Sequence, residues 1–212
     1  MHAMELGAHL PLFTLSPGTP SPAGLTGYAR RASRLGYRWL TVNDHMVFPM
    51  PWLDGLTALA SVVEASGDMG LATTVSLPTV RGPVPLAKAI AALDLVSGGR
   101  FAAGVGAGSD PMDHVAVGAP AAGGAARFAE SVRALRALLG RDPQPFEGRH
   151  WSTAGMALEP RPAAGRPPLW VAGSGPAGLR RAAELGDGWI ASGFDTTPER
   201  FAASWATVRG HV

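Results

Sequence analysis

Cysteine is absent from this chain, and lysine occurs only once among its 212 residues. Without cysteine there is no disulfide framework, no thiol nucleophile and no Cys-ligated zinc, so the compartment we expect is the reducing cytoplasm. Charged residues make up 16% of the chain, against about 25% in an average soluble protein. Hydrophobic residues reach 46%, which excludes a disordered chain and indicates a large buried core.

Long apolar runs are also missing. No run reaches the roughly 18 residues that a membrane span needs. Residues 1–15 contain Glu5 and lack the basic stretch with which a signal peptide starts. The formal net charge is only +2, and the arginines are scattered singly or in pairs without a basic stripe. We therefore expect neither a membrane nor a nucleic acid as a partner.

Short apolar runs alternate with stretches of helical periodicity along the chain. Leu25, Tyr28 and Ala32 lie on one helix face with Gly36 as a stop, and Thr196 to Glu199 has the spacing of a capping box. The pattern predicts strands over 4–10, 39–42, 70–75, 101–105, 168–172 and 188–191, and helices over 25–35, 56–63, 86–96, 128–139, 179–185 and from 196 through 208. Segment 143–167 breaks the alternation, and within it residues 146–151 resemble a small hairpin.

Six strand-then-helix units predict a parallel sheet, because right-handed crossovers place each helix outside it. Residues 30–39 and 180–189 match at six of ten positions, and each segment is predicted to be a helix, a glycine stop and a strand that opens with tryptophan. A helix-to-strand connection that occurs twice favours a closed barrel over an open sheet. The alternative is that the similarity of the two segments is due to chance. We expect an α/β fold, a TIM-type (β/α) barrel of about six units in a single domain over 1–212.

Small and ionisable residues gather where the predicted strands end. In parallel sheets and barrels the ligand binds at the carboxyl ends of the strands. This one-sided distribution predicts a binding site there, and the segments concerned are 9–11, 43–45, 74–76 with Arg81, 106–110, 173–176 and 192–193.

Asp44 and His45 are the sharpest pair among these residues. A histidine at a strand exit can give or take a proton near neutral pH, and the alternative is a solvated histidine beside a capping aspartate. In extended backbone Asp44 points the other way, so we expect it to support the loop. Gly173-Ser174-Gly175 offers free amides at the start of a helix, which suits a phosphate, and the alternative is a tight turn that needs glycine.

Two other motifs do not meet the requirements of a binding site for a dinucleotide or for a metal. The glycines of 104–108 do not make a dinucleotide-binding fingerprint, because Asp110-Pro111 follows instead of a helix start and no acidic strand end lies about 20 residues on. Asp110, Asp113 and His114 lack a further ligand that would complete a metal set, so we assign no metal and expect a solvated loop there.

A set of short motifs follows a fixed order along the chain: Leu35-Gly36-Tyr37, Asn43-Asp44-His45, Ala72-Thr73-Thr74-Val75, Ala87-Lys88 through Leu93-Asp94, Ser97-Gly98-Gly99-Arg100-Phe101, Gly104-Val105-Gly106-Ala107-Gly108, Phe146-Glu147-Gly148, Pro168 to Gly175, and Gly186-Asp187-Gly188-Trp189. This set resembles the luciferase-like monooxygenase superfamily, and most of all its branch that uses the deazaflavin coenzyme F-420 (F420). The resemblance covers residues 4 to about 192.

The resemblance implies a TIM-type barrel that binds a flavin or deazaflavin at the strand ends. It places Asp44 and His45 against the ring, with His45 handling a proton. It implies a cis peptide between Thr74 and Val75, pressed against the ring. The loop of Gly106, Ala107 and Gly108 would border the ring, and Gly173, Ser174 and Gly175 would cradle the cofactor phosphate.

The chain departs from the family pattern in two ways. Sugar-phosphate dehydrogenases of the branch carry a glutamate where this chain has Ser109, which argues against glucose-6-phosphate as substrate and is expected to leave His45 without an acid partner. Family members also continue through two further strand-helix units, so we expect a shortened barrel, incomplete at its C-terminus and with two open sheet edges.

The function that we expect is hydride transfer between F420 and a small organic substrate. The alternatives are an FMN-dependent monooxygenase of the same superfamily and a non-catalytic flavin-binding barrel. Phe48, Trp52, Met112 and Trp151 are the expected pocket residues, or else ordinary loop anchors. The open sheet edges favour a homodimer.

Overall fold

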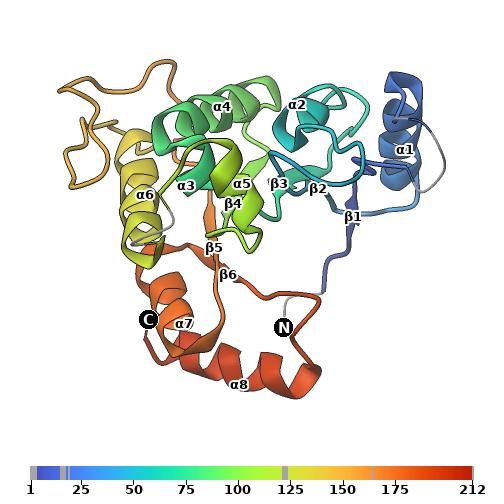
Figure 1. Ribbon diagram of the computed structural model, residues 1–212. Helices are drawn as coiled ribbons and strands as arrows, with labels where there is room; N and C mark the ends of the chain where they lie inside the picture. Colours follow the sequence, from blue (N-terminus) through green and yellow to red (C-terminus); the bar gives the residue numbers. More distant parts are fainter. Residues whose placement is uncertain (1–3, 15–17, 19, 121–123, 164, 212) are drawn as a thin grey trace.

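A computed structural model describes residues 4–14, 18, 20–120, 124–163 and 165–211. Six strands form one parallel sheet in the order of the chain, and the sheet curls so that most helices lie around its convex side (Figure 1). The strands are β1 (Gly7–His9), β2 (Trp39–Val42), β3 (Gly70–Thr73), β4 (Phe101–Val105), β5 (Leu169–Ala172) and β6 (Gly188–Ile190). The predicted α/β fold of six strand-helix units is confirmed in the form of a half-barrel.

The helices follow the strands as the periodicity predicts, with two additions. They are α1 (Pro22–Arg34), α2 (Gly55–Ala60), α3 (Pro78–Arg81), α4 (Pro83–Val96), α5 (Pro111–Ala116), α6 (Gly124–Leu138), α7 (Gly175–Leu185) and α8 (Pro198–Arg209). Side-chain oxygens of Ser21, Asp54, Asp110 and Thr197 accept an amide of the first turn of α1, α2, α5 and α8. The short helices α3 and α5 are absent from the sequence expectation.

The core lies between the sheet and its helices. Successive residues of a strand point to opposite faces, so alternate positions meet the helices. Leu40, Leu71, Phe101 and Val171 are at most 1% exposed there. No described helix is long and apolar enough to cross a membrane.

Two tryptophans meet on the concave face of the sheet. The rings of Trp39 and Trp170 lie edge to face with their centroids 5.0 Å apart. Gly70 pairs with Trp39 and Gly188 with Trp170 in the sheet register. A Cβ at Gly70 would lie 2.5 Å from the Trp39 ring, and one at Gly188 would lie 2.7 Å from Trp170. Glycine at these two positions therefore makes room for the rings.

The expectation that one corner is built twice is wrong, although the fold it supported is right. Gly36 follows the C-cap of α1 in the left-handed region, with a φ of 81°. Gly186 is itself the C-cap of α7 and is extended, with a φ of −99°. Trp39 faces the concave side, whereas Trp189 stacks on Phe201 of α8 with the centroids 5.3 Å apart. The identical residues of the two segments thus form two different helix-to-strand connections.

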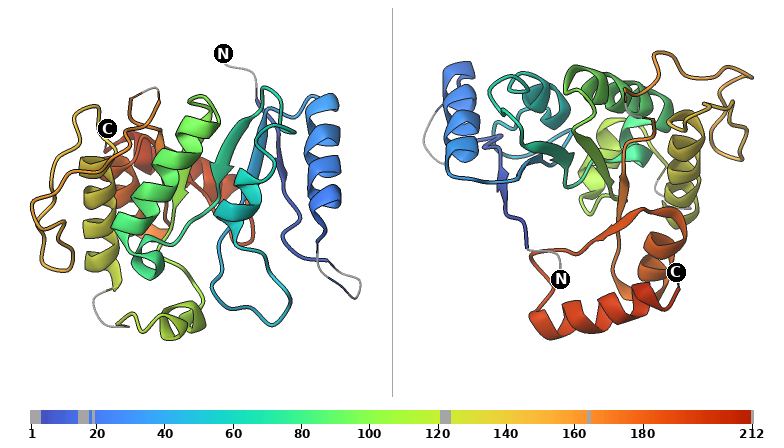
Figure 2. Two further views of the ribbon diagram at one scale, coloured as in Figure 1. Left: turned by 90° about the horizontal axis from the view of Figure 1, so that it is seen from above. Right: turned by 180° about the vertical axis from the view of Figure 1, so that it is seen from behind.

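The segment between α6 and β5 lies beside α6 (Figure 2) and contains the predicted hairpin. Glu147 pairs with Ser152 in an antiparallel bridge. The carboxylate of Glu130 on α6 accepts the amides of His150 over 2.6 Å and Trp151 over 3.0 Å. Burial raises the pKa of Glu130, but these backbone hydrogen bonds outweigh burial and hold the pKa below its ordinary value. An ionised side chain therefore fixes the hairpin to α6.

Candidate functional site

The carboxyl ends of β3, β4 and β5 meet at one end of the sheet. The peptide bond between Thr74 and Val75 is cis, as the family resemblance implies. Beyond it, the amide of Ser76 donates to Gly104 over 2.8 Å, and the amide of Gly106 donates to Ser76 over 3.0 Å. A Cβ at Gly106 would lie 2.5 Å from Cγ2 of Val75 and 3.6 Å from Cβ of Ala172. Glycine at this position therefore lets the three strand ends approach one another.

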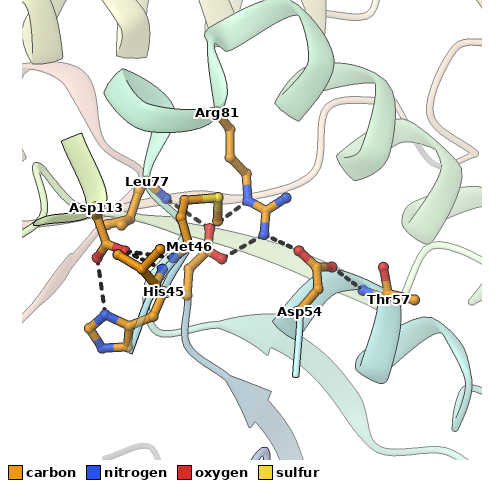
Figure 3. Close-up of polar contacts among 9 residues, drawn as sticks. His45, Met46, Asp54, Thr57, Leu77, Arg81 and Asp113 are labelled. Atoms are coloured by element: carbon orange, nitrogen blue, oxygen red, sulfur yellow. Dashed lines mark hydrogen bonds and ion pairs between the residues drawn. The ribbon is translucent and has the colours of Figure 1, made fainter. Parts of the chain in front are cut away.

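The ring of His45, just after β2, meets a carboxylate that comes 68 residues later in the chain. Its Nδ1 lies 3.0 Å from Oδ2 of Asp113 on α5. The other oxygen of Asp113 accepts the amides of Met46 over 2.6 Å and Val47 over 3.1 Å (Figure 3). Asp113 is only 1% exposed. One buried carboxylate thus anchors both the imidazole and the loop that carries it.

Two expectations are wrong at this point. Asp113 does not belong to a solvated loop, because α5 buries it against the end of β2. His45 does not lack an acid partner either: Ser109 is exposed, and Asp113 is the carboxylate that meets the imidazole. Spacing along the chain gave no signal of this pair, because only the tertiary fold brings β2 and α5 together.

His45, Asp110 and Asp113 can each offer one ligand atom, and these atoms lie within 4.8 Å of one another. One oxygen of Asp113 already accepts two amides, and the other lies 3.0 Å from Nδ1 of the imidazole. Hydrogen bonding accounts for this arrangement, and we assign no metal to it.

Asp44 is bound by α3 and by the residue that precedes this helix. Its oxygens accept Nε and Nη2 of Arg81 on α3, both over 2.6 Å, and the amide of Leu77 over 3.3 Å. Arg81 also pairs with Asp54, the N-cap of α2. These contacts fit the interpretation of Asp44 as a support for the loop, since they tie the end of β2 to α2 and α3.

Charge reinforces this network. Burial lowers the pKa of Arg81, but its hydrogen bonds and charge pairing with Asp44 and Asp54 outweigh burial and raise the pKa. Burial raises the pKa of Asp54, yet the hydrogen bonds from Arg81 and from Thr57 outweigh it and lower the pKa. Arg81 and Asp54 are therefore both charged at neutral pH.

Aromatic rings surround His45 on its loop. The centroid of Phe48 lies 4.8 Å from that of the imidazole, and the centroid of Trp52 lies 5.1 Å from it. Of the four expected pocket residues, these two contact His45. Met112 is 56% exposed on α5, and Trp151 lies on the hairpin that Glu130 holds. The structure thus brings half of the expected pocket residues to the histidine.

The turn between β5 and α7 leads into a helix that has no side-chain capping bond at its N-terminus. Ser174 is the N-cap of α7 with no side-chain capping bond, and Gly175 has a φ of 64°. The carbonyl of Gly173 accepts the indole N–H of Trp189 over 2.8 Å, and a Cβ at Gly173 would lie 2.6 Å from the carbonyl oxygen of Gly178. Open amides at the start of a helix suit a phosphate.

The loop after β4 is held from α3 and turns at a glycine. The hydroxyl of Thr79 donates to the carbonyl of Ala107 over 3.3 Å. Gly108 has a φ of 83° and lies in the left-handed region. A Cβ there would lie 3.4 Å from Nε2 of His114. The loop therefore runs between α3 and α5, close to the end of β3.

A second histidine lies on the concave face. Nδ1 of His9 is 3.1 Å from the Thr41 hydroxyl, and Nε2 is 3.2 Å from Oδ1 of Asn43. Burial lowers the pKa of His9, and the hydrogen bond with Asn43 offsets part of this effect. The exits of β1 and β2 are thus joined by side chains, as their predicted place at one sheet end suggests.

Comparison with known proteins identifies the family of this chain. The sequence pattern of the luciferase-like monooxygenase family matches residues 4–211. An F420-dependent glucose-6-phosphate dehydrogenase of Beutenbergia cavernae is 31% identical over 181 residues, which are 80% of this chain and 52% of that protein. An F420-dependent hydroxymycolic acid dehydrogenase of Mycobacterium tuberculosis is 29% identical over 86% of this chain and 52% of its own length. The chain spans about half the length of these curated relatives.

Solved structures agree on the fold. The monooxygenase RslO1 of Streptomyces bottropensis superposes with a TM-score of 0.86 at 25% identity, over 98% of this chain and 65% of that one. An F420-dependent secondary alcohol dehydrogenase, solved with an F420-acetone adduct, superposes with a TM-score of 0.82 at 21% identity, over 98% of this chain and 64% of that one. The pattern match along almost the whole sequence and the shared half-barrel establish that the chain belongs to the luciferase-like monooxygenase family.

Proposed function

We propose that this chain binds coenzyme F420 at its strand ends and takes part in hydride transfer between this deazaflavin and a small organic substrate. The observation that carries the proposal is the anchored His45, 3.0 Å from Asp113, at the sheet end where β3 closes with the cis Thr74–Val75 peptide. The F420-dependent names of the curated relatives support the choice of cofactor.

The residues at the strand ends fit such a cofactor. Ser76 is 1% exposed, and within the described part of the chain its hydroxyl has no hydrogen-bond partner. Thr74 and Val75, with the loop of Gly106, Ala107 and Gly108, would border the ring. Gly173, Ser174 and Gly175 would hold the phosphate through the amides at the start of α7. When bound, a deazaflavin supplies a ring carbon that accepts or donates a hydride.

In this proposal His45 handles the proton that accompanies the hydride, while Asp44 holds the loop in place through Arg81. Phe48 and Trp52 shield part of the imidazole from water, since both rings contact it. His45→Ala should lower turnover by about 100-fold or more, the range for loss of a general acid or base, with the cofactor Kd changed little. Unchanged turnover would remove His45 from the mechanism.

A titration of the protein with F420 and with FMN, followed by fluorescence, tests the cofactor. We expect F420 to bind at least about 10-fold more tightly, a difference of about 1.4 kcal/mol. The fold shared with a type II Baeyer-Villiger monooxygenase of Pseudomonas putida, solved in complex with FMN, supports FMN as the second candidate. Tighter FMN binding with oxygen consumption would select it. Binding without turnover across a panel of alcohols and carbonyl compounds would select a non-catalytic barrel, and failure of both cofactors to bind would refute the proposal.

We also propose a homodimer that works in the cytoplasm. β1 and β6 are the edge strands of the described sheet, and an unpaired edge favours association with another chain. The absence of cysteine fits a reducing compartment. Light scattering that gives the mass of one chain, 21.8 kDa, would refute the dimer.

A further inference from the structure

The hydrogen bonds of Asp113 determine which nitrogen of His45 carries a proton. An ionised carboxylate only accepts hydrogen bonds, and a neutral imidazole has one N–H and one bare nitrogen. One oxygen of Asp113 accepts the amides of Met46 and Val47, and the other lies 3.0 Å from Nδ1 of His45, where an ionised carboxylate needs a donor. The proton of the neutral ring is therefore on Nδ1, which leaves Nε2 as the bare nitrogen.

We propose that Asp113 is a positioning residue that holds His45 in the Nδ1–H tautomer, so that Nε2 accepts a proton from the substrate. This inference rests on the proposed function. In the step concerned the substrate O–H bond breaks, an N–H bond forms at Nε2, and the electron pair stays on the substrate oxygen. Asp113 then faces an imidazolium, and a buried carboxylate stabilises that charge.

The burial and reach of Asp113 separate this role from ordinary loop support. The side chain of Asp113 is 1% exposed, whereas that of His45 is 21% exposed. The carboxylate thus holds the inner edge of the ring and leaves the outer edge accessible. Asp113 and the Phe48 and Trp52 rings restrict rotation of the imidazole, so its accessible nitrogen has a fixed direction.

The chain offers a matched control. Asp110 belongs to the same cluster of oxygen and nitrogen atoms within 4.8 Å, but its side chain caps α5 by accepting the amide of Met112 over 2.9 Å. Asp110→Asn removes the same charge and keeps a good N-cap. Asp113→Asn differs in one respect, because its amide can donate to Nδ1 of His45 and drive the proton to Nε2.

Nitrogen-15 NMR of the protein without added cofactor tests the tautomer directly. His45→Gln identifies the signals among the six histidines. We expect a protonated Nδ1 and a bare Nε2 in the neutral ring of the parent chain and of Asp110→Asn, and the reverse in Asp113→Asn. A parent chain with the proton on Nε2 would overturn the proposal, and this result needs only the assignment variant His45→Gln and no folded Asp113 variant.

Turnover with F420 then tests the consequence. Asp113→Asn should lower kcat by about 10- to 100-fold or more, as outer partners of functional histidines do, with KM and the cofactor Kd nearly unchanged. Asp113→Glu should recover part of the loss, and Asp110→Asn should lower kcat by less than Asp113→Asn does. An unchanged kcat in Asp113→Asn would overturn the role. Absence of turnover in the parent chain with a protonated Nδ1 would refute the proposed function and leave the tautomer assignment standing.

Discussion

Replacing Arg81 by methionine tests how the loop after β2 is held. In the structure Arg81 donates two hydrogen bonds of 2.6 Å to Asp44 and also pairs with Asp54. The side chain of Arg81 is 18% exposed and that of Asp44 only 2%, while Asp54 is 40% exposed. Arg81→Met therefore leaves a buried carboxylate without its cation.

The size of the effect follows from these exposures. Loss of one partner of a buried ion pair costs about 3–5 kcal/mol, because the remaining charge stays buried. The partly exposed Asp54 contact adds at most about 1 kcal/mol. For a chain of this length each kcal/mol lowers Tm by about 2–4 °C, so we expect Tm to fall by about 6–24 °C.

Thermal unfolding followed by circular dichroism measures the shift. The matched variant is Asp44→Asn combined with Arg81→Met, which removes the stranded charge as well. We expect this double variant to be more stable than the sum of the single changes by about 1 kcal/mol or more. A fall in Tm of less than about 3 °C for Arg81→Met would refute the reasoning, since it is below what a buried unpaired carboxylate predicts.

Three further changes have definite outcomes. Gly106→Ala puts a Cβ 2.5 Å from Cγ2 of Val75 and should weaken cofactor binding by about 10-fold in the fluorescence titration, about 1.4 kcal/mol, whereas Gly27→Ala on α1, with open space around it, should not. Glu130→Ala leaves two partly buried amides of the hairpin without their acceptor at a cost of about 1–3 kcal/mol, and trypsin should then cut after Arg149 faster than in the parent chain. Burial raises the pKa of Asp187, but hydrogen bonds from Arg166 and the Leu169 amide outweigh it, so its folded pKa lies below the unfolded value of about 3.9. Its stabilisation is thus present at neutral pH and lost as the pH falls below that value, and the Tm difference between Asp187→Asn and the parent should shrink from pH 7 to pH 3; a constant difference would contradict the assignment.

The order of strands and long helices could be predicted because buried parallel strands appear in the sequence as short apolar runs and amphipathic helices as apolar residues at helical spacing. Phe128, Val132 and Leu135 recur at helical spacing, and all three are fully buried on α6. Strand ends were less certain. The predicted strand over 70–75 ends at Thr73, and Ser76 returns to the sheet only as an isolated bridge with Val105.

The two similar segments, 30–39 and 180–189, show that sequence identity over ten residues does not guarantee the same local structure. Trp39 and Trp189 stand at matching positions of the two segments, yet the first contacts Trp170 on the concave face and the second contacts α8. The side-chain period of a strand is two residues, so a shift of one position moves a side chain to the other face. Sequence similarity across the corner carried no information about that shift.

The contacts of the site that the sequence did not reveal come from the two short helices. A helix of four or six residues, such as α3 (Pro78–Arg81) or α5 (Pro111–Ala116), makes too few turns to show a hydrophobic period, although a proline at the first turn marks each start. These helices contribute Arg81 and Asp113, which hold Asp44 and His45 from opposite sides. Because both contacts join segments far apart in the chain, the geometry of His45 depends on the assembled half-barrel and not on local preference. Substitutions at Arg81 and at Asp113 should therefore have different effects. A substitution at Arg81 should act mainly on the stability of the fold, and one at Asp113 on the tautomer of the His45 imidazole.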